Sequence, residues 1–153
     1  MINVAPLLIV DDDTDVRDSL RALLESAGFT VRDFDSAKKV LADSSISQGA
    51  CLIADIRMPD MDGLELQEEL SRRQVGLPVI IVTGHGDVPL AVRAMKAGAI
   101  DFIEKPFDGE HMLDSVRRAI AYAKQNRSKA ELAQTAEHLI AGLTAREREV
   151  LEQ

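Results

Sequence analysis

Three consecutive aspartates, Asp11–Asp13, directly follow the apolar run LLIV at positions 7 to 10. Taken alone, such a triplet is most often a solvated acidic turn. Three further side chains that can take part in chemistry stand at or near the ends of other short apolar runs: Asp55, Thr83 and Lys105. Carboxylates, a hydroxyl and an amine at equivalent points of separate apolar runs indicate one shared site, provided that the fold brings these points together.

Short apolar runs alternate along the chain with segments of helical periodicity. The pattern predicts strands at 7–10, 30–34, 51–54, 79–82 and 101–104, and helices at 14–27, 36–42, 64–73, 89–97 and from about 110 onward. Several of the strands are too uniformly apolar to have a solvated face, which is typical of a parallel sheet covered by helices on both sides. The repeated strand and helix therefore predict an α/β fold, a doubly wound five-stranded parallel sheet with right-handed crossovers, (βα)5.

In sheets of this kind, ligands bind beyond the carboxyl ends of the strands, where the strand order reverses. If the first and third strands are neighbours, Asp11, Asp12 and Asp55 lie within a few ångströms of one another, and their repulsion requires a positive counter-charge. Lys105 can supply one such charge. Carboxylate oxygens favour Mg²⁺ or Mn²⁺ over zinc, so the sequence predicts a divalent-cation site at this edge of the sheet.

The composition limits the class of protein. The 153 residues, 46% of them hydrophobic, suit one globular domain with a short appendage. The formal net charge of −8 gives no sign of nucleic-acid or membrane binding by this chain. The single cysteine, Cys51, excludes an internal disulfide and stands in an apolar run, where we expect it to be buried. The N-terminal segment has no basic leader and no apolar run of membrane-spanning length, so we expect a cytoplasmic protein.

Four motifs in order along the chain resemble the receiver domain of bacterial two-component response regulators: IVDDD, LIADIRMPDMDGLEL, VIIVTGHGD and AMKAGAIDFIEKPF. The resemblance covers roughly residues 5 to 122, and GHGDVPLAVRAMKAGA is similar to the FixJ-type branch, the NarL/FixJ regulators with LuxR-type output. It implies a flavodoxin-like fold and a regulatory protein, not a classical enzyme, that accepts a phosphoryl group from a cognate sensor histidine kinase.

The same resemblance implies roles for the acidic residues. Asp55 corresponds to the phosphoacceptor, and Asp11 and Asp12 correspond to the metal-binding acidic pair. Asp12 and Asp55, together with the main-chain carbonyl of Arg57, are expected to bind Mg²⁺ or Mn²⁺ directly. Asp13 has no such role in the family, and we expect it to cap the first helix.

The resemblance also implies a path from phosphorylation to output. Lys105 contacts the phosphoryl group, and the Lys105–Pro106 peptide bond is expected to be cis. Thr83 and Phe102 are the switch hydroxyl and the switch aromatic. Arg57 and His85 stand two residues beyond Asp55 and Thr83, where side chains modulate dephosphorylation. The helix at 89–97, the fifth strand and the last helix are expected to form a surface for homodimerisation on phosphorylation.

The C-terminal residues carry a separate prediction. We expect a receiver domain at 1–122, a helical linker at 123–142, and at 143–153 the start of a LuxR-type helix-turn-helix domain, with Thr144 and Glu147 as a capping box. This last segment is incomplete, so DNA binding is expected only through a C-terminal domain that the chain does not contain.

Two other classes of function remain open from the sequence. A free-standing receiver would act by binding a protein partner, without a DNA-binding domain. A phosphohydrolase of the haloacid-dehalogenase type also forms an aspartyl phosphate at a strand end, but its D-x-D-x-[T/V] motif fails here, because Asp15 stands at the last position after Asp11 and Asp13. The site of the acyl phosphate separates the classes: Asp55 for a receiver, Asp11 for a hydrolase.

Overall fold

A computed structural model describes residues 5–84 and 88–125 of the chain. Its strands form one parallel sheet in the order β2-β1-β3-β4-β5, which confirms the predicted five-stranded parallel sheet. All five strands belong to one compact unit, Met1–Ala123. The strands are β1 (Leu7–Val10), β2 (Val31–Phe34), β3 (Cys51–Asp55), β4 (Val79–Thr83) and β5 (Asp101–Glu104).

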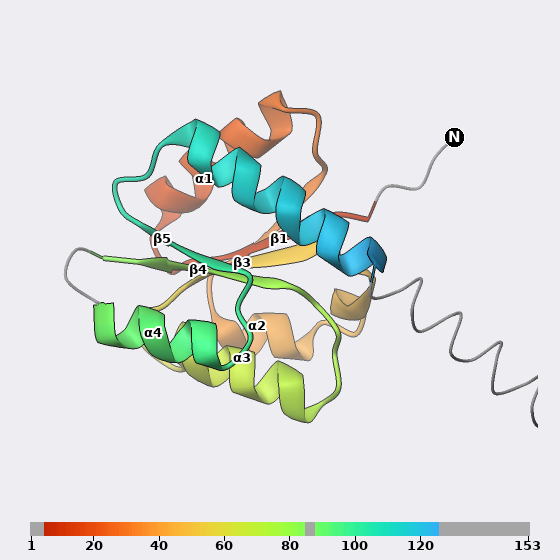
Figure 1. Ribbon diagram of the computed structural model, residues 1–153, viewed down its shortest axis with the longest axis vertical. Helices are drawn as coiled ribbons and strands as arrows, with labels where there is room; N and C mark the ends of the chain where they lie inside the picture. The colour runs from red at the N-terminus through yellow and green to blue at the C-terminus, as the bar shows by residue number, and fades with distance from the viewer. Residues whose placement is uncertain (1–4, 85–87, 126–153) are drawn as a thin grey trace, which may run out of the picture. The chain divides into compact units, whose positions relative to one another are not determined.

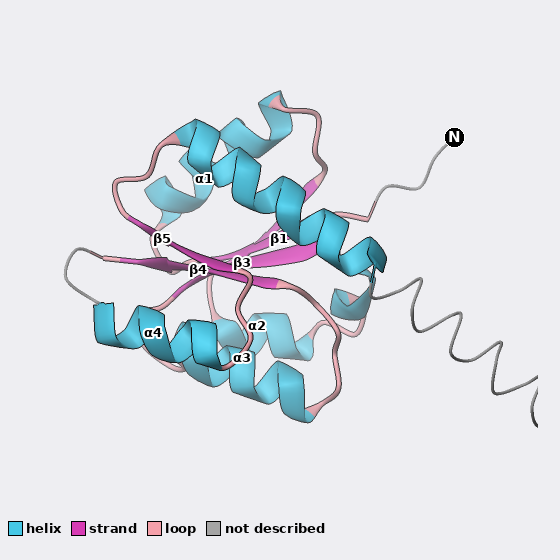
Figure 2. Ribbon diagram, in the orientation of Figure 1, coloured by secondary structure: helices cyan, strands magenta, loops and turns pink. Residues whose placement is uncertain are grey.

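Helices follow the strands and cover both faces of the sheet (Figures 1 and 2). The labelled helices are α1 (Thr14–Ser26), α2 (Ala37–Ala42), α3 (Gly63–Arg72) and α4 (Val88–Lys96), and the chain is helical again over 109–125. The four labelled helices begin and end within one residue of the prediction, and the last helix begins at residue 109, against a predicted start at about 110. The short 3₁₀ helix η1 (Ile46–Gln48), before β3, was not predicted.

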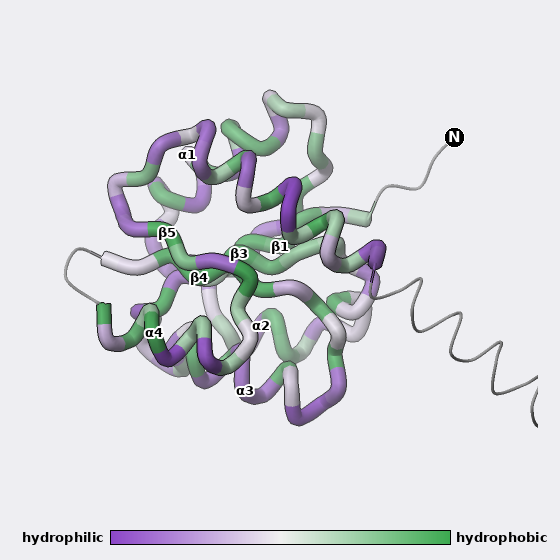
Figure 3. Tube along the Cα trace, viewed as in Figure 1, coloured by the Kyte–Doolittle hydropathy of each residue, from purple (hydrophilic) through white to green (hydrophobic). Residues whose placement is uncertain are grey.

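Two separate hydrophobic cores lie on the two faces of the sheet. Along β1, Leu7 and Ile9 pack with α1 and the helix at 109–125, whereas Leu8 and Val10 pack with α2, α3 and α4. This alternation follows the two-residue repeat of a strand, so a strand covered on both faces must be apolar throughout. Every residue of β1, β3 and β4 is buried, and Figure 3 shows the central strands as the most apolar part of the chain.

Local signals in the sequence set the helix ends. Asp13 caps α1 as predicted, because its carboxylate accepts hydrogen bonds from the backbone amides of Asp15 and Val16. The Ser36 hydroxyl caps α2 in the same way. Gly28 follows α1 and Gly98 follows α4 with φ values of 94° and 106°, the left-handed conformation that glycine adopts without strain. The Asp13 cap places the start of α1 directly beyond Asp11 and Asp12, which follow the end of β1.

The sheet order also creates the site. Because β1 lies between β2 and β3, with Val10 in register with Ala54, the residues that end β1 and β3 are neighbours. The strand order reverses at this point, where doubly wound sheets bind their ligands.

Within the described residues, no helix has the length and apolarity to span a membrane. His85 and residues 126–153, which include most of the predicted linker and all of the predicted helix-turn-helix start, lie outside the described residues.

Candidate functional site

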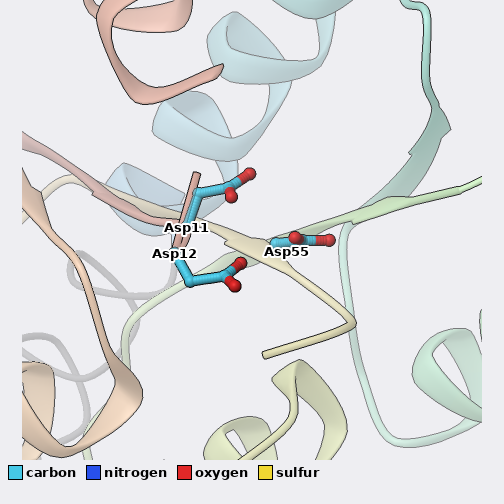
Figure 4. A group of neighbouring side chains, drawn as sticks. All are labelled: Asp11, Asp12 and Asp55. Atoms are coloured by element: carbon cyan, nitrogen blue, oxygen red, sulfur yellow. The ribbon is translucent and has the colours of Figure 1, made fainter. Parts of the chain in front are cut away.

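Three carboxylates meet beyond the ends of β1 and β3 (Figure 4). Asp11 and Asp12 follow β1, and Asp55 is the last residue of β3; one carboxylate oxygen from each lies within 4.8 Å of the others. Asp11 and Asp55 are buried, whereas Asp12 is exposed. The predicted proximity of these three residues is therefore confirmed, and their oxygens make a donor set that fits a hard divalent cation.

The counter-charge comes from Lys105, directly after β5. Its Nζ lies 3.1 Å from Asp11 Oδ2 and 3.3 Å from Asp55 Oδ2, so one ammonium group pairs with both buried carboxylates. The backbone amide of Lys105 donates to the Thr83 carbonyl at 2.8 Å, which ties the segment after β5 to the end of β4. The Lys105–Pro106 peptide bond is cis, as predicted.

The electrostatics of the cluster are unbalanced without a further cation. Burial and then the neighbouring Asp11 charge raise the pKa of Asp55, and the opposing effect of Lys105 does not cancel them. Burial acts to lower the pKa of Lys105, but the charges of Asp55 and Asp11 outweigh it and raise that pKa. The ammonium group is therefore held charged, and the carboxylate cluster still has an excess of negative charge.

The loop after Asp55 is fixed by short backbone contacts. The Arg57 amide donates to Asp55 Oδ1 at 3.3 Å, and the Gly63 amide donates to the Ile56 carbonyl at 3.0 Å. A Cβ at Gly63 would lie 2.7 Å from the Asp55 carbonyl oxygen, so this approach of α3 to β3 requires glycine. Asp62 caps α3 in a capping box with Glu65, which sets the start of the helix.

An open hollow of about 420 Å³ adjoins the acidic cluster on the side of this loop. Asp12 and Arg57 line it together with apolar residues of the loop and of α4. The exposed carboxylate of Asp12 is therefore accessible from solvent, as binding of a cation requires. The lining residues are Asp12, Ile56, Arg57, Met58, Pro59, Asp62 and Leu90.

The two predicted switch residues lie on neighbouring strands. Thr83 ends β4 and is buried, and β4 is adjacent to β3, which carries Asp55. Phe102, in β5, is partly buried and packs against the hydrophobic core on the α2, α3 and α4 face. The structure therefore brings together Asp11, Asp12, Asp55 and Lys105, with Thr83 at the next strand end and Phe102 at the edge of the core. His85 is not described.

One residue near the cluster was not predicted from the sequence. The Arg17 guanidinium, on α1, donates from Nη1 to the Asp11 carbonyl oxygen at 2.7 Å. In the sequence, Arg17 is only a basic residue four positions after the helix cap, in an otherwise acidic segment. This pattern does not reveal that its side chain turns back toward the strand.

Comparison with known proteins connects this geometry to a family. The model of the response regulator receiver domain matches residues 7–117. The chain belongs to the response regulator receiver domain family. The transcriptional regulatory protein FixJ of Bradyrhizobium diazoefficiens is 45% identical over 147 residues, covering 95% of this chain and 71% of that protein. The response regulator protein TodT of Pseudomonas putida F1 is 42% identical over 145 residues, covering 95% of this chain and 64% of that protein.

A solved receiver-containing structure agrees with the fold. The response regulator StyR matches with a TM-score of 0.84 at 42% identity, over 97% of this chain and 76% of that chain. The receiver is thus of the FixJ and TodT type, and its function is that of a response regulator. The hydrolase alternative is not favoured, since Asp13, which its motif would need for catalysis, caps α1.

Proposed function

We propose that this receiver accepts a phosphoryl group on Asp55 from a cognate sensor histidine kinase in the cytoplasm. The observation that carries the proposal is the cluster of Asp11, Asp12 and Asp55 with the Lys105 ammonium bound to two of its members. A regulatory receiver needs a nucleophile, a cation site and a fixed positive charge within one small volume, and this cluster supplies all three.

The residues of the cluster have separate tasks in the transfer. A carboxylate oxygen of ionised Asp55 forms the bond to phosphorus while the bond from phosphorus to the donor's leaving group breaks, so no general base is needed. Asp11 and Asp12, Asp55 and the Arg57 main-chain carbonyl would hold Mg²⁺ or Mn²⁺. When bound, the cation neutralises charge on the phosphoryl oxygens. The Lys105 ammonium group leaves the Asp55 carboxylate and binds a phosphoryl oxygen, and the Thr83 hydroxyl binds another phosphoryl oxygen.

The proposed switch converts this local change into a new surface. The phosphoryl oxygens draw the Thr83 hydroxyl inward, and Phe102 rotates into the space that is freed. The surface that changes comprises α4, β5 and the helix over 109–125, through which two phosphorylated chains form an isologous homodimer. Exposed apolar side chains of α4 support this surface: Val88 is 54% exposed, Val92 44% and Met95 40%.

The lifetime of the phosphorylated state depends on access of water to the phosphorus. Arg57 lines the hollow beside Asp12, and His85 stands two residues beyond Thr83. We expect Arg57→Ala and His85→Ala to change the rate of dephosphorylation more than the yield of phosphorylation. Unchanged decay in both variants would rule out this role.

The output is proposed to be control of transcription. FixJ is named a transcriptional regulatory protein, and the chain spans 71% of its length. In this proposal residues 1–122 form the receiver, 123–142 a helical linker and 143–153 the start of a LuxR-type helix-turn-helix domain, which reaches DNA only as part of a longer protein. A free-standing receiver that acts by protein contacts is the second candidate, supported by the apolar surface of α4 alone.

Mapping the acyl phosphate tests the central proposal. Incubated with Mg²⁺ and acetyl phosphate, the chain should gain one acid-stable, base-labile phosphoryl group on Asp55. Asp55→Asn should abolish the modification, and Asp12→Ala should weaken the binding of Mg²⁺ because a direct ligand is lost. Asp18→Asn, which removes an exposed carboxylate of α1, serves as the matched control and should leave the yield unchanged. A phosphoryl group on another residue contradicts the proposal.

Sedimentation tests the dimer separately. The phosphorylated chain should self-associate at tens of micromolar. A dimer is detectable at roughly these concentrations if its free energy of association exceeds that of a millimolar Kd by a few kcal/mol. Val92→Lys, on the exposed face of α4, should prevent association and leave phosphorylation of Asp55 intact. A phosphorylated chain that stays monomeric at these concentrations contradicts dimerisation by the receiver alone.

A further inference from the structure

The turn that carries Asp11 and Asp12 is held by bonds from three directions. The Asp11 amide donates to the Phe34 carbonyl of β2 at 3.2 Å, and the Asp13 amide donates to Asp11 Oδ1 at 2.9 Å. The third bond is the one from Arg17 Nη1 to the Asp11 carbonyl oxygen at 2.7 Å. Of the three, the bond from Arg17 is the shortest and the only one with a charged donor, and it is made to the backbone, whereas the charged Lys105 Nζ donates to the Asp11 side chain at 3.1 Å.

The acceptor of this bond belongs to the peptide group that joins Asp11 to Asp12. Because a peptide group is planar, fixing its oxygen also fixes the direction of the Asp12 amide and thus the start of the Asp12 residue. Asp12 itself is exposed, so packing does little to set the direction of its carboxylate. The orientation of this carboxylate toward Asp55 therefore depends on the backbone that Arg17 holds.

Arg17 is itself held in place. Only 15% of its side chain is exposed, its Nε lies 3.8 Å from Asp33 Oδ2 on β2, and its Nη2 donates to the Thr14 hydroxyl at 3.4 Å. The neighbouring Arg21 shares the same anchor, with Nη1 3.2 Å from Asp33 Oδ1, and its other bond is to Glu25 on α1. Arg17 therefore links β2 to the acidic turn, whereas the recorded bonds of Arg21 go to Asp33 and Glu25.

We infer that Arg17 is a positioning residue for the divalent-cation site: by holding the Asp11–Asp12 peptide it keeps the Asp12 carboxylate in the geometry that binds Mg²⁺. This inference rests on the proposed function, in which Asp12 is a direct ligand. A positioning role and a purely electrostatic role for Arg17 predict opposite changes in the affinity for Mg²⁺. A positive charge beside a cation site opposes the binding of Mg²⁺, so a purely electrostatic role for Arg17 predicts tighter binding when it is removed, and a positioning role predicts weaker binding.

Calorimetric titration of the unphosphorylated chain with MgCl₂ tests the inference, since it measures binding without any transfer reaction. Arg17→Met keeps the length of the apolar stem and removes the donor, and we expect the Kd for Mg²⁺ to rise about tenfold, as for other groups that orient metal ligands. Arg17→Lys keeps the charge with a single point donor and should raise the Kd by a smaller factor. Arg21→Met, the matched control, should leave the Kd unchanged.

Each result separates the possibilities. Tighter binding or an unchanged Kd in Arg17→Met overturns the inference, and so does an equal rise in Arg21→Met, which would indicate a general loss of stability around Asp33. Urea unfolding of each variant checks that it is folded during the titration, and Arg17→Lys decides the matter if Arg17→Met does not fold. If the unmodified chain does not bind Mg²⁺, or if Asp12→Ala still binds it, the proposed function is overturned as well. If the unmodified chain binds Mg²⁺ and the Arg17 variants bind it equally well, this inference alone is overturned.

Discussion

The ammonium group of Lys105 lies 3.3 Å from Asp55 Oδ2, and yet the pKa of Asp55 stays raised. Burial and the Asp11 carboxylate disfavour the ionised form by more than the lysine favours it. Ionised Asp55 therefore costs stability in the chain without a metal ion. The site keeps the Asp55 carboxylate charged at the expense of the stability of the fold, which is a common feature of functional sites.

Replacing Asp55 should therefore stabilise the metal-free chain. A raised folded-state pKa means that stability falls as the pH rises from the ordinary value of 3.8 through the folded-state pKa. In EDTA near neutral pH, Asp55→Asn should raise the midpoint of thermal unfolding by roughly 3 °C. The gain should shrink as the pH falls and vanish below the ordinary value of 3.8, where Asp55 is protonated in both states. Saturating Mg²⁺ should reverse the order by stabilising the unmodified chain more; a less stable Asp55→Asn in EDTA contradicts this account.

Gly63 offers a test of how closely α3 must approach β3. In Gly63→Ala the new Cβ would meet the Asp55 carbonyl oxygen at 2.7 Å and the Ile56 Cα at 3.0 Å, both of them backbone atoms that move only with the strand. We expect a loss of about 1–3 kcal/mol in the free energy of unfolding, measured with urea. Phosphorylation by acetyl phosphate should also slow, because Asp55 is displaced.

Gly76→Ala is the matched control for this substitution. A Cβ at Gly76 meets nothing within 4 Å, so the change should be neutral or stabilising by up to about 1 kcal/mol. If both variants lost the same stability, the close approach at Gly63 would not be the cause.

Much of the fold was predictable because strands covered on both faces must be apolar at every position. The runs at 7–10 and 51–54 carry this signal, and β1 and β3 follow it closely. The order of the strands was less predictable, since right-handed crossovers allow several orders, and the proximity of Asp11 to Asp55 depended on β1 and β3 being neighbours. The structure settles that condition through the register of Val10 with Ala54.

Contacts made by backbone atoms and by long side chains were not predictable in the same way. No sequence pattern reports that Arg17 turns back to the Asp11 carbonyl, because this depends on the angle between α1 and β1. The roles of Asp55, Thr83 and Phe102 came from family motifs rather than from physical signals, and these roles remain predictions. Asp55 and Thr83 end the adjacent strands β3 and β4, and Phe102 lies in β5, which is next to β4.

A second prediction about pH concerns Asp101, at the start of β5. Burial acts to raise its pKa, but hydrogen bonds from Ser115 at 2.5 Å and Arg118 at 2.8 Å outweigh burial, so the pKa is lowered. A lowered folded-state pKa gives stability that is present above the ordinary value of 3.8 and is lost as the pH falls through the folded-state value. Asp101→Asn should therefore cost about 1–2 kcal/mol near neutral pH and much less below the folded-state pKa of Asp101.

Urea unfolding across this pH range measures the effect on Asp101. Asp114→Asn removes the exposed carboxylate that also pairs with Arg118, at 3.2 Å, and should change stability by less than about 0.5 kcal/mol. An Asp101→Asn penalty that is the same at every pH would mean that the charge of the carboxylate contributes nothing.

The final prediction uses Cys51 as a reporter for the strand that carries Asp55. Cys51 is the first residue of β3 and is fully buried, and burial raises the pKa of its thiol to about 12. Because the thiolate is the reactive form, Ellman's reagent should label the folded chain very slowly and the urea-unfolded chain at once, with one equivalent. Lys38→Cys in a Cys51→Ala background, at an exposed position of α2, should react immediately and so controls for the reagent. If labelling requires the sheet to open, Mg²⁺ at about ten times its Kd should slow it about tenfold, because opening releases the bound cation. Rapid labelling in native buffer, or a rate that Mg²⁺ does not change, would mean that β3 opens at the Cys51 end without disturbing the cluster at Asp55.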